Sequence, residues 1–424
     1  MTDLHHQSVS ALRALQADLE KRYRAFQARS LSLDMTRGKP CAEQLDLSLG
    51  LLTCVDEDSY LAADGTDCRN YGGLDGLPEA KALFAEYLEV APEEIIIGGA
   101  SSLNMMHDTI LSSMVYGAAE GCAPWAGRSV KFLCPCPGYD RHFAICERLG
   151  IAMIPIAMDA AGPDMEAVER LVAQDASIVG MWCVPRYSNP TGIVYSGEVV
   201  ERLAKMETAA PDFRIYWDNA YAVHHLTDSP PPLKNILAAC KAAGNPDRVL
   251  LFGSTSKVTF AGAGLAVMAG SVKNMERRKA QMAIQTIGPD KLNQLRHVRF
   301  LKSMEGIRAH MRKHAAILKP KFDAVDEILT RELGDMGGAS WTRPKGGYFV
   351  SLDTAEGCAK EVIARAAQAG VRLTPAGSTY PYKRDPRDSN IRIAPTFPPL
   401  EDIILATELL AICVQLVSVE RALG

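Results

Sequence analysis

The segment around Lys257 gives the clearest indication of a catalytic site in this sequence. Lys257 follows an apolar run, Arg248–Phe252, that predicts a buried strand, and it belongs to the hydroxyl-rich segment Gly253–Val258. Open α/β sheets bind ligands beside the carboxyl ends of their strands. An amine at that edge can form a Schiff base, and an apolar or cationic environment would lower its pKa and free its lone pair. A lone Ser-Lys pair more often belongs to a solvated loop. Whether Lys257 is a reactive lysine therefore depends on which residues other segments bring near it.

A second strand-like run, Ile95–Ile97, ends in a turn of glycine and hydroxyl residues and precedes a helix-like stretch, Leu103–Met114. Such a turn directs backbone N–H groups and a helix dipole toward one point, which suits a phosphate. The same composition is also ordinary for a structural turn. The candidate phosphate-binding residues are Gly99, Ala100, Ser101 and Ser102, with Ser254 and Ser256 from the lysine segment.

Two further strand-like runs end in residues that could contact a flat ring. Val130–Cys136 precedes Tyr139, whose side chain could stack on a cofactor or could pack as a core or rim tyrosine. Ile178–Val184 leads into a turn that contains Asn189, and Asn-Pro-Thr-Gly is also a strong turn former by itself.

The run Phe213–Trp217 delivers Asp218 and, three residues later, Tyr221. A carboxylate at the end of a central strand is unfavourable to bury without a cationic partner, so Asp218 is expected to face a site.

These residues together match what bound pyridoxal phosphate requires. Lys257 would form the imine, and Asp218 would keep the pyridine nitrogen protonated so that the ring withdraws electrons. Tyr221 and Asn189 would hydrogen-bond the phenolate oxygen of the ring and lower the imine pKa. Tyr139 would stack on the ring. A Schiff-base lyase without this cofactor would need Lys257 but not the other residues.

The chain resembles the fold-type I pyridoxal-phosphate enzymes, and specifically the class I/II aminotransferases, over nearly its whole length. Six segments carry the resemblance in the order of the family: Tyr71–Glu79, Asn189–Gly192, Asp218–Tyr221, Ser254–Lys257, Lys345–Phe349 and Asn390–Pro395. Each segment is weak alone, but six in the same order make an accident very improbable.

Within this family, the sequence is similar to a bacterial aspartate aminotransferase subgroup marked by Thr-Arg-Gly-Lys-Pro, here Thr36–Pro40, and Tyr-Ser-Asn-Pro-Thr-Gly, here Tyr187–Gly192. The resemblance implies transamination between aspartate or glutamate and 2-oxoglutarate or oxaloacetate. Aromatic or 2-aminoadipate specificity and β-lyase activity are the alternatives. A regulator with an aminotransferase-like domain would need a DNA-binding module, for which the first 45 residues are too few.

The resemblance also assigns roles to individual residues. Arg392 would bind the substrate α-carboxylate, because a planar guanidinium makes two parallel hydrogen bonds. Tyr71 would reach the cofactor phosphate of a neighbouring subunit, which implies a homodimer with shared sites. His142 would orient Asp218 from behind, and Gly38 would pass its backbone close to the substrate.

One segment departs from the family pattern. The family often has an arginine eight or nine residues after the lysine that neutralises the phosphate, whereas this chain has Gly262–Met268 without any arginine there. The phosphate is then expected to rely on backbone amides, serines, Tyr71 or another cation.

A dicarboxylic substrate needs a second cation, since an unpaired carboxylate in an apolar pocket is unfavourable. Arg37 and Lys39, which flank Gly38, are the preferred candidates. The less favoured candidates are Arg141, Arg186 and Arg296.

The length of 424 residues indicates more than one core. We expect an α/β fold, with a large domain of a mainly parallel seven-stranded sheet between helices and a smaller α+β domain. The predicted units are an N-terminal helix and arm (1–45) that joins the small domain, a cofactor-binding domain (46–295) and a small domain (296–424). The predicted elements at the two ends are a helix at 9–29, a long charged helix from about 296, and strands within 341–352, 371–374 and 390–394.

Composition excludes several classes of function. A net charge of −4 gives no basic surface for nucleic acid, and we saw no apolar stretch of about 20 residues or N-terminal signal pattern. Eleven scattered cysteines favour reduced thiols and a cytoplasmic enzyme. Cys134 and Cys136 lack a second pair at zinc spacing, so no metal is expected. His224 and His225 follow Tyr221 closely, but adjacent histidines there are more often structural.

Overall fold

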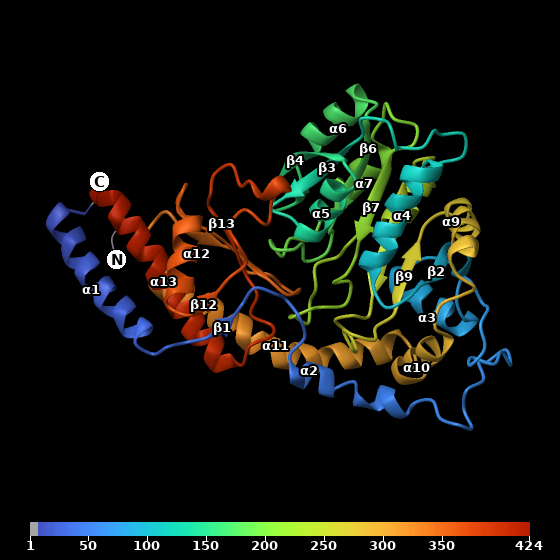
Figure 1. Ribbon diagram of the computed structural model, residues 1–424, viewed down its shortest axis with the longest axis horizontal. Coiled ribbons are helices and arrows are strands. Elements are labelled where there is room, and N and C mark those ends of the chain that lie inside the picture. Colours follow the sequence, from blue (N-terminus) through green and yellow to red (C-terminus); the bar gives the residue numbers. More distant parts are fainter. Residues whose placement is uncertain (1–6) are drawn as a thin grey trace.

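A large sheet forms the centre of the molecule in the computed structural model, which describes residues 7–424 (Figure 1). Residues 1–6, where no secretion signal is predicted, lie outside the described part. The sheet comprises β2 (Ile95–Ile97), β3 (Lys131–Cys136), β4 (Ala152–Asp159), β5 (Gly162–Pro163), β6 (Ile178–Cys183), β7 (Arg214–Asp218), β8 (Val249–Ser254) and β9 (Ala266–Ala269).

The strand order of this sheet is β2-β9-β8-β7-β6-β3-β4-β5. Strands β8, β7, β6, β3 and β4 are parallel, whereas β9 runs antiparallel to both of its neighbours. The sheet is therefore mainly parallel, as the sequence predicts. The sheet has one strand more than the seven predicted. The additional strand, β5, has two residues and lies at the edge of the sheet, antiparallel to β4.

Helices connect the strands and pack around the sheet, because parallel neighbours need a crossover connection. They are α3 (Pro78–Leu88), α4 (Ser102–Tyr116), α5 (Asp140–Arg148), α6 (Met165–Gln174), α7 (Gly197–Lys205), α8 (Ile236–Ala242), α9 (Val272–Gln285) and α10 (Lys291–Leu301). Short elements complete this half: α2 (Ala42–Asp46) and the 3-10 turns η2 (Leu49–Thr53) and η3 (Pro92–Glu94).

A second, smaller layer is built from both ends of the chain (Figure 1). Its strands are β1 (Leu33–Asp34) paired with β12 (Val371–Arg372), and the antiparallel sheet β10 (Ser340–Trp341), β11 (Val350–Asp353) and β13 (Asn390–Ile393). Its helices are α1 (Val9–Gln27), α12 (Ala359–Gln368) and α13 (Leu400–Leu423), and a 3-10 turn, η4, spans Pro381–Lys383.

Helix α11 (Met304–Leu333) links two separate apolar cores. Ile307 and Met311 pack in the core of the large sheet, whereas Phe322 and Leu329 pack in the second core together with α1 and α13. The N-terminal helix thus shares a core with the C-terminal elements. The exact domain boundaries at 45/46 and 295/296 stay a prediction.

The charged stretch from about residue 296 lies in two helices, so the prediction of one long helix was wrong. Helix α10 ends at Leu301, because the next residue, Lys302, has a φ of 65° and a ψ of −48° that cannot continue a right-handed helix. Helix α11 begins after Ser303, whose hydroxyl accepts a hydrogen bond from Gly306 N–H. Lysine is a good helix former, so the composition gave no sign of this break.

Residues 342–349 form a connection between β10 and β11 and not a continuous strand. Its glycines pack tightly: a Cβ on Gly346 would lie 2.3 Å from His224 O, and one on Gly347 would lie 2.7 Å from Tyr187 Cβ. Gly347 also has a φ of 85°, which only glycine adopts readily. This connection therefore fits closely against the two segments that follow β6 and β7.

Helix α13 is long and apolar enough to span a membrane, which the sequence reading missed. However, 72% of its most apolar window is buried within the protein. It packs against α1, α11 and α12. We therefore describe α13 as a core helix of the second layer.

Candidate active site

The carboxyl ends of four adjacent parallel strands bring the predicted cofactor residues together. Asp218, the last residue of β7, is in register with Phe252 of β8, and Lys257 follows three residues after the end of β8. Tyr139 follows β3, and Asn189 follows β6. All four side chains line one cavity of about 190 Å³.

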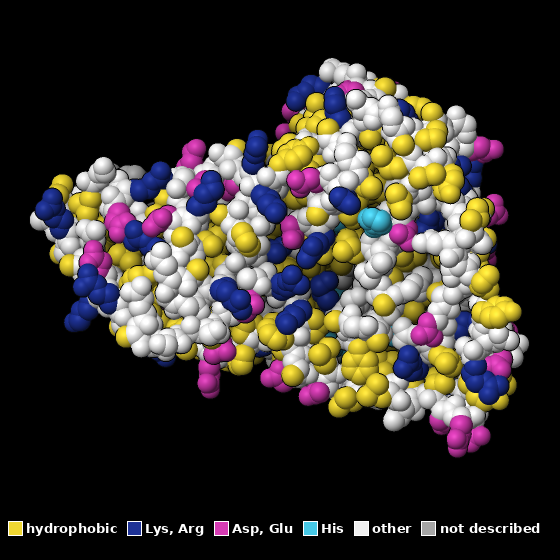
Figure 2. Space-filling view, in the orientation of Figure 1, with side chains coloured by type: hydrophobic (Ala, Val, Ile, Leu, Met, Phe, Trp, Pro, Cys, Tyr) yellow, Lys and Arg dark blue, Asp and Glu magenta, His cyan; other side chains and the backbone are white. Residues whose placement is uncertain are grey.

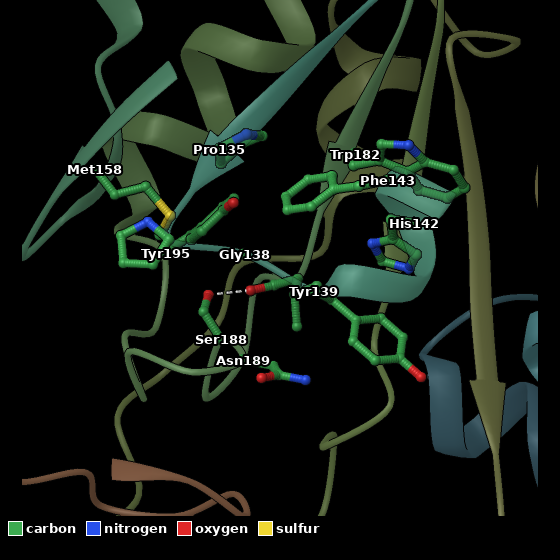
Figure 3. A pocket seen from close by; sticks show the side chains of 12 residues that line it. Pro135, Gly138, Tyr139, His142, Phe143, Met158, Trp182, Ser188, Asn189 and Tyr195 are labelled. Carbon is green, nitrogen blue, oxygen red and sulfur yellow. Dashed lines mark hydrogen bonds between the residues drawn. The ribbon is translucent and has the colours of Figure 1, made fainter. Parts of the chain in front are cut away.

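One carboxylate oxygen of Asp218 contacts a histidine, and the other has no hydrogen-bond partner among the described residues. The side chain is about 3% exposed, and its Oδ2 lies 3.0 Å from His142 Nε2. Its Oδ1 is buried without a hydrogen-bond partner among the described residues. The ring of His142 stacks on Trp182 at 4.1 Å, which fixes the orientation of the imidazole (Figure 3). The free Oδ1 is thus available to a group that enters the cavity.

Lys257 is held beside aromatic rings. Its Nζ lies 5.0 Å from the centre of the Tyr221 ring, and its backbone oxygen lies 3.2 Å from His224 Nε2 and accepts from Tyr348 Oη at 3.5 Å. Burial lowers the pKa of Lys257, and Asp218 acts in the opposite direction. Burial also lowers the pKa of His224 well below its usual value, so this histidine stays neutral. Its Nε2 contacts the backbone oxygen of Lys257.

The turn that we predict to bind phosphate lies at the amino end of α4, beside the cavity. Ser101 is the N-cap residue but its side chain makes no capping hydrogen bond, and Ser102 opens the helix at the cavity wall. Ser254 and Ser256 line the same wall, and Ser256 Oγ donates to Ala100 O at 3.3 Å. Such a helix terminus binds anions through its free N–H groups and its dipole. Gly99 lies in the same turn, where its carbonyl accepts from Ala266 N–H at 2.7 Å.

Among the described residues that line this cavity, Lys257 is the only cation. The segment Gly262–Met268 forms a turn and then β9, and it contains no charged side chain. The departure from the family pattern that the sequence shows therefore persists in three dimensions.

Tyr139 and Tyr221 are both held as neutral phenols. Burial raises the pKa of each ring hydroxyl, and their proximity to each other adds to the shift of Tyr221. Tyr221 can therefore act as a hydrogen-bond donor at neutral pH. Figure 3 shows Tyr139 beside Asn189, with His142 above it on α5.

Arg392, on β13, reaches the same place from the smaller layer. The guanidinium is buried, and its Nη1 donates to Asn189 Oδ1 at 3.3 Å and to Asp140 Oδ1 at 3.0 Å. Thr374 Oγ1 accepts from its Nη2 at 3.2 Å. Sequence reading missed Asp140 and Thr374, because an acidic residue in the first turn of a helix is usually explained by the helix dipole.

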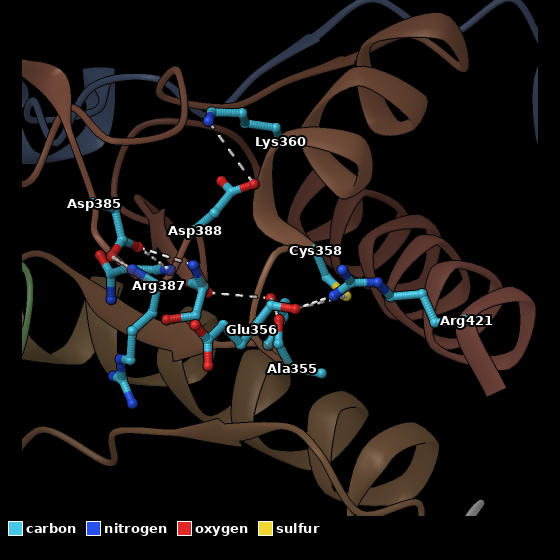
Figure 4. A network of polar contacts seen from close by, with 11 residues as sticks. Ala355, Glu356, Cys358, Lys360, Asp385, Arg387, Asp388 and Arg421 are labelled. Carbon is cyan, nitrogen blue, oxygen red and sulfur yellow. Dashed lines mark hydrogen bonds and ion pairs between the residues drawn. The ribbon is translucent and has the colours of Figure 1, made fainter. Parts of the chain in front are cut away.

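The strand that carries Arg392 is positioned by the segment before it (Figure 4). Asp385 accepts hydrogen bonds from the backbone N–H groups of Ser389 and Asn390 at 2.9 and 2.8 Å. Gly357 N–H donates to Arg387 O at 2.7 Å and ties this segment to the start of α12. The backbone that leads into β13 is therefore fixed.

A second cavity of about 370 Å³ adjoins the first and shares Lys257, Tyr139, Asn189 and Tyr221 with it. Arg392 and Arg37 line it, as does Arg141. Figure 2 shows Lys and Arg side chains gathered near the middle of the visible face, where the surface is hollowed.

The structure separates the two preferred candidates for a second carboxylate partner. Arg37 lines the second cavity, whereas Lys39 Nζ lies 3.7 Å from the ring centre of Phe397, outside its lining. Gly38 lies between them, and a Cβ there would approach Phe349 Cζ to 2.5 Å. Gly38 thus gives room to Phe349, over whose ring Arg392 lies at 5.0 Å.

Three of the remaining candidate residues are not in these cavities. Arg186 Nη1 donates to Pro231 O, and Arg296 lies on α10. Tyr71 is 82% exposed and does not line the site of its own chain. Cys134 and Cys136 are buried in β3, where each thiol donates to a backbone carbonyl.

The first cavity fits pyridoxal phosphate on chemical grounds. A buried carboxylate oxygen without a partner suits a protonated pyridine nitrogen, and the amino end of α4 suits a phosphate. Lys257, an amine of lowered pKa, lines the same cavity.

Comparisons with known proteins agree with this chemistry. Residues 7–424 match the family described as aspartate amino-transferase. An aspartate aminotransferase of Corynebacterium glutamicum is 48% identical over 405 residues, which cover 95% of this chain and 94% of that protein. A Mycolicibacterium smegmatis protein named as an aminotransferase is 51% identical over 413 residues, 96% of each chain.

The crystal structure of an aspartate transaminase from Corynebacterium glutamicum superposes with a TM-score of 0.97, at 46% identity and 99% coverage of both chains. The structure of an α-aminoadipate aminotransferase from Thermus thermophilus, at 20% identity and a TM-score of 0.74, shares the fold. With a family match over almost its whole length, this chain belongs to the aspartate aminotransferase family.

Proposed function

We propose that this aminotransferase transfers the amino group of L-aspartate to 2-oxoglutarate and forms oxaloacetate and L-glutamate, with pyridoxal phosphate as its cofactor. The observation that carries the proposal is the buried, unpartnered Oδ1 of Asp218 in one cavity with Lys257. The names of the relatives that are similar over the whole chain support aspartate as the amino donor.

The side chains around the first cavity would hold the cofactor as follows. Asp218 Oδ1 would accept a hydrogen bond from the ring nitrogen, while His142 fixes the other oxygen. Tyr221 and Asn189 would bond the ring oxygen, and Tyr139 would lie against the ring face. The phosphate would contact the α4 terminus and the wall serines Ser101, Ser102, Ser254 and Ser256.

Bound pyridoxal phosphate supplies a carbonyl carbon for an amine and a protonated ring that withdraws electrons. Lys257 Nζ would remove the proton from the substrate Cα and return it on the other side of the transferred nitrogen. Its lowered pKa keeps a larger fraction of the amine neutral and thus able to accept a proton. His142 bonds one oxygen of the Asp218 carboxylate and leaves Oδ1 to face the ring nitrogen.

Arg392 would bind the α-carboxylate of the substrate in the second cavity. Its Nη1 contacts Asp140, so the substrate carboxylate would compete with or replace that contact. Arg37 would bind the side-chain carboxylate, because it lines the same cavity. This pair of guanidinium groups would account for a preference for dicarboxylic substrates.

The same proposal includes a homodimer with shared sites. Tyr71 projects from the chain and is mostly exposed, and several large apolar side chains are also exposed. They are Leu49, Leu52, Leu111, Val115, Tyr116, Ile284 and Ile287. A second copy that covers them would bring Tyr71 to a neighbouring cofactor, and apolar burial would stabilise the pair.

A cytoplasmic location is also part of the proposal. It is supported by the eleven cysteines, nine of which are buried at scattered positions. Thiols of this kind are typical of proteins kept in a reducing compartment.

The test is the activity of two variants with aspartate and 2-oxoglutarate. Lys257→Ala is expected to abolish turnover and to keep the thermal unfolding midpoint near that of the wild type, because the side chain that is lost lines a cavity. Asp218→Asn should still bind the cofactor but lose at least about 100-fold in kcat, since an amide cannot stabilise a charged ring nitrogen. More than trace activity in Lys257→Ala, or near-normal kcat in Asp218→Asn, would contradict the proposal.

A further inference from the structure

A third, smaller cavity with polar walls lies near the amino ends of β7 and β8 in the large sheet. Arg214 begins β7, four residues before Asp218, and Leu250 lies near the start of β8. Both line a cavity of about 30 Å³ that is closed by residues of α4, β9 and α9. Because the cofactor residues follow the carboxyl ends of β7 and β8, this cavity is remote from the proposed site.

Three arginines line this small cavity: Arg214 from β7, and Arg277 and Arg278 from α9. Among the described residues that line it, there is no Asp or Glu. Positive charge therefore converges on the cavity from two different elements without a carboxylate in its wall.

Two of these guanidinium groups are deeply buried. Arg214 and Arg278 are each about 6% exposed, and the Nε atom of each is buried without a hydrogen-bond partner in the described part of the chain. Burial lowers the pKa of both groups. A buried charge that is only partly compensated is unfavourable, so an anion in the cavity would stabilise this arrangement.

The contacts that these arginines do make are mainly with neutral groups. Arg214 Nη1 donates to Phe213 O, and Arg277 Nη2 donates to Gly117 O at the carboxyl end of α4. A helix terminus offers only about half a negative charge, which three guanidinium groups exceed.

Three carboxylates lie near these arginines without entering the cavity wall: Asp212 and Asp247 near Arg214, and Asp108 near Arg278. Asp108 Oδ2 is 3.9 Å from Arg278 Nη2, and its side chain is about 31% exposed. Arg278 Nη1 donates instead to Ser112 Oγ at 2.8 Å. The positive charge of the three arginines is thus only partly compensated by the protein itself.

We propose that this cavity binds one small inorganic anion of the size of chloride, held between Arg214, Arg277 and Arg278. A water molecule needs about 10 to 15 Å³ of free space, so a cavity of about 30 Å³ admits a monatomic anion but not an amino acid or a nucleotide. The ion would join α9 to the carboxyl end of α4, and its expected effect is on stability.

The test is thermal unfolding of the holoenzyme in chloride at constant ionic strength, with sodium gluconate as the replacement salt. Chloride is expected to raise the Tm of the wild type by about 2 to 4 °C in a saturable manner. Arg278→Gln should lose this dependence, because the variant lacks one of the two buried charges. Arg308→Gln removes an exposed charge on α11 and should behave as the wild type.

A purely structural role for the arginines predicts a different result. Arg278→Gln would then lower the Tm equally at every chloride concentration, and parallel chloride curves for all three proteins would overturn the proposal. Wild-type crystals soaked in bromide give a readout that does not depend on any variant. We expect an anomalous bromide peak between the three guanidinium groups, and absence of bromide from the cavity would also overturn the proposal.

Discussion

Arg392 binds a carboxylate of its own chain at the place where we propose that it binds the substrate. Its Nη1 is shared between Asp140 and Asn189, and the guanidinium lies over the Phe349 ring. Asp140 therefore keeps the buried cation paired before a substrate arrives, which limits the cost of burying it. The incoming carboxylate would replace one charge-assisted contact with another of similar strength.

At the same scale, the structure favours Arg37 over Lys39 as the partner of a second carboxylate. Arg37→Ala is expected to raise KM for aspartate by about 10 to 100-fold, equivalent to about 1.4 to 2.7 kcal/mol, and to leave KM for alanine nearly unchanged. Lys39→Ala is the matched control, since its ammonium group faces Phe397, and it should have a small effect. The measurement is the KM for aspartate and for alanine from steady-state kinetics of both variants. Equal losses for aspartate and alanine in Arg37→Ala would show a structural role instead.

At the scale of elements, α10 holds the loop that carries Tyr71. Lys291, in the first turn of α10, is about 3% exposed, and its Nζ donates to Asn70 O at 2.6 Å and to Gly72 O at 2.8 Å. These two carbonyls bracket Tyr71. The loop also packs against Gly288, where a Cβ would lie 2.6 Å from Gly72 O. The chain thus fixes the base of an exposed tyrosine.

Lys291→Met is expected to weaken cofactor binding by about 10 to 100-fold, because two charge-assisted hydrogen bonds to the Tyr71 loop are lost. The measurement is the Kd of pyridoxal phosphate from fluorescence quenching. Lys279→Met serves as a control, since its partner Asp75 keeps an ion pair with Lys81 at 2.7 Å. If Lys291→Met lowered the Tm but left the Kd unchanged, the contact would stabilise the fold without positioning Tyr71.

For the whole molecule, shared sites make a prediction about mixed dimers. Tyr71→Ala and Lys257→Ala chains should each be inactive, yet refolding them together should restore about a quarter of the wild-type activity. The reason is that half of randomly formed dimers are mixed, and each mixed dimer has one complete site out of two. Mixed dimers that are present but inactive would place Tyr71 in the site of its own chain or outside any site.

The stability of the whole molecule should also depend on buried histidines. Burial lowers the pKa of His297 and of His314 to about 4. Between that value and the usual 6.5 the unfolded chain binds more protons than the folded one, so stability falls as the pH is lowered through this window. Each histidine contributes up to about 1.4 kcal/mol per pH unit.

Urea unfolding midpoints measured at pH 7, 6 and 5 check this pH dependence. His297 contacts the hydroxyl groups of Thr255 and Thr259, so His297→Gln can keep polar contacts and should show a shallower loss toward acid. His107→Gln, at a more exposed position on α4, should follow the wild type. An unchanged pH slope in His297→Gln would remove this histidine from the acid response.

The sequence by itself determined the fold class, the family and the grouping of the cofactor residues. Lys257, Asp218, Asn189 and Tyr139 each follow an apolar strand, and parallel strands place their carboxyl ends at one edge, so local pattern was sufficient to predict their meeting. The order of short segments along the chain then gave the resemblance to the family.

Only the tertiary structure decided which side chains of the smaller layer line the cavity of about 370 Å³. Arg37 and Lys39 are two residues apart and equal in charge, yet the packing of Phe349 against Gly38 and of Lys39 against Phe397 sends them to different places. The pairing of Asp140 with Arg392, 252 residues away, and the three arginines beneath α4 likewise join segments far apart in the chain. Contacts of this kind depend on how the layers pack, and no periodicity within a single segment records them.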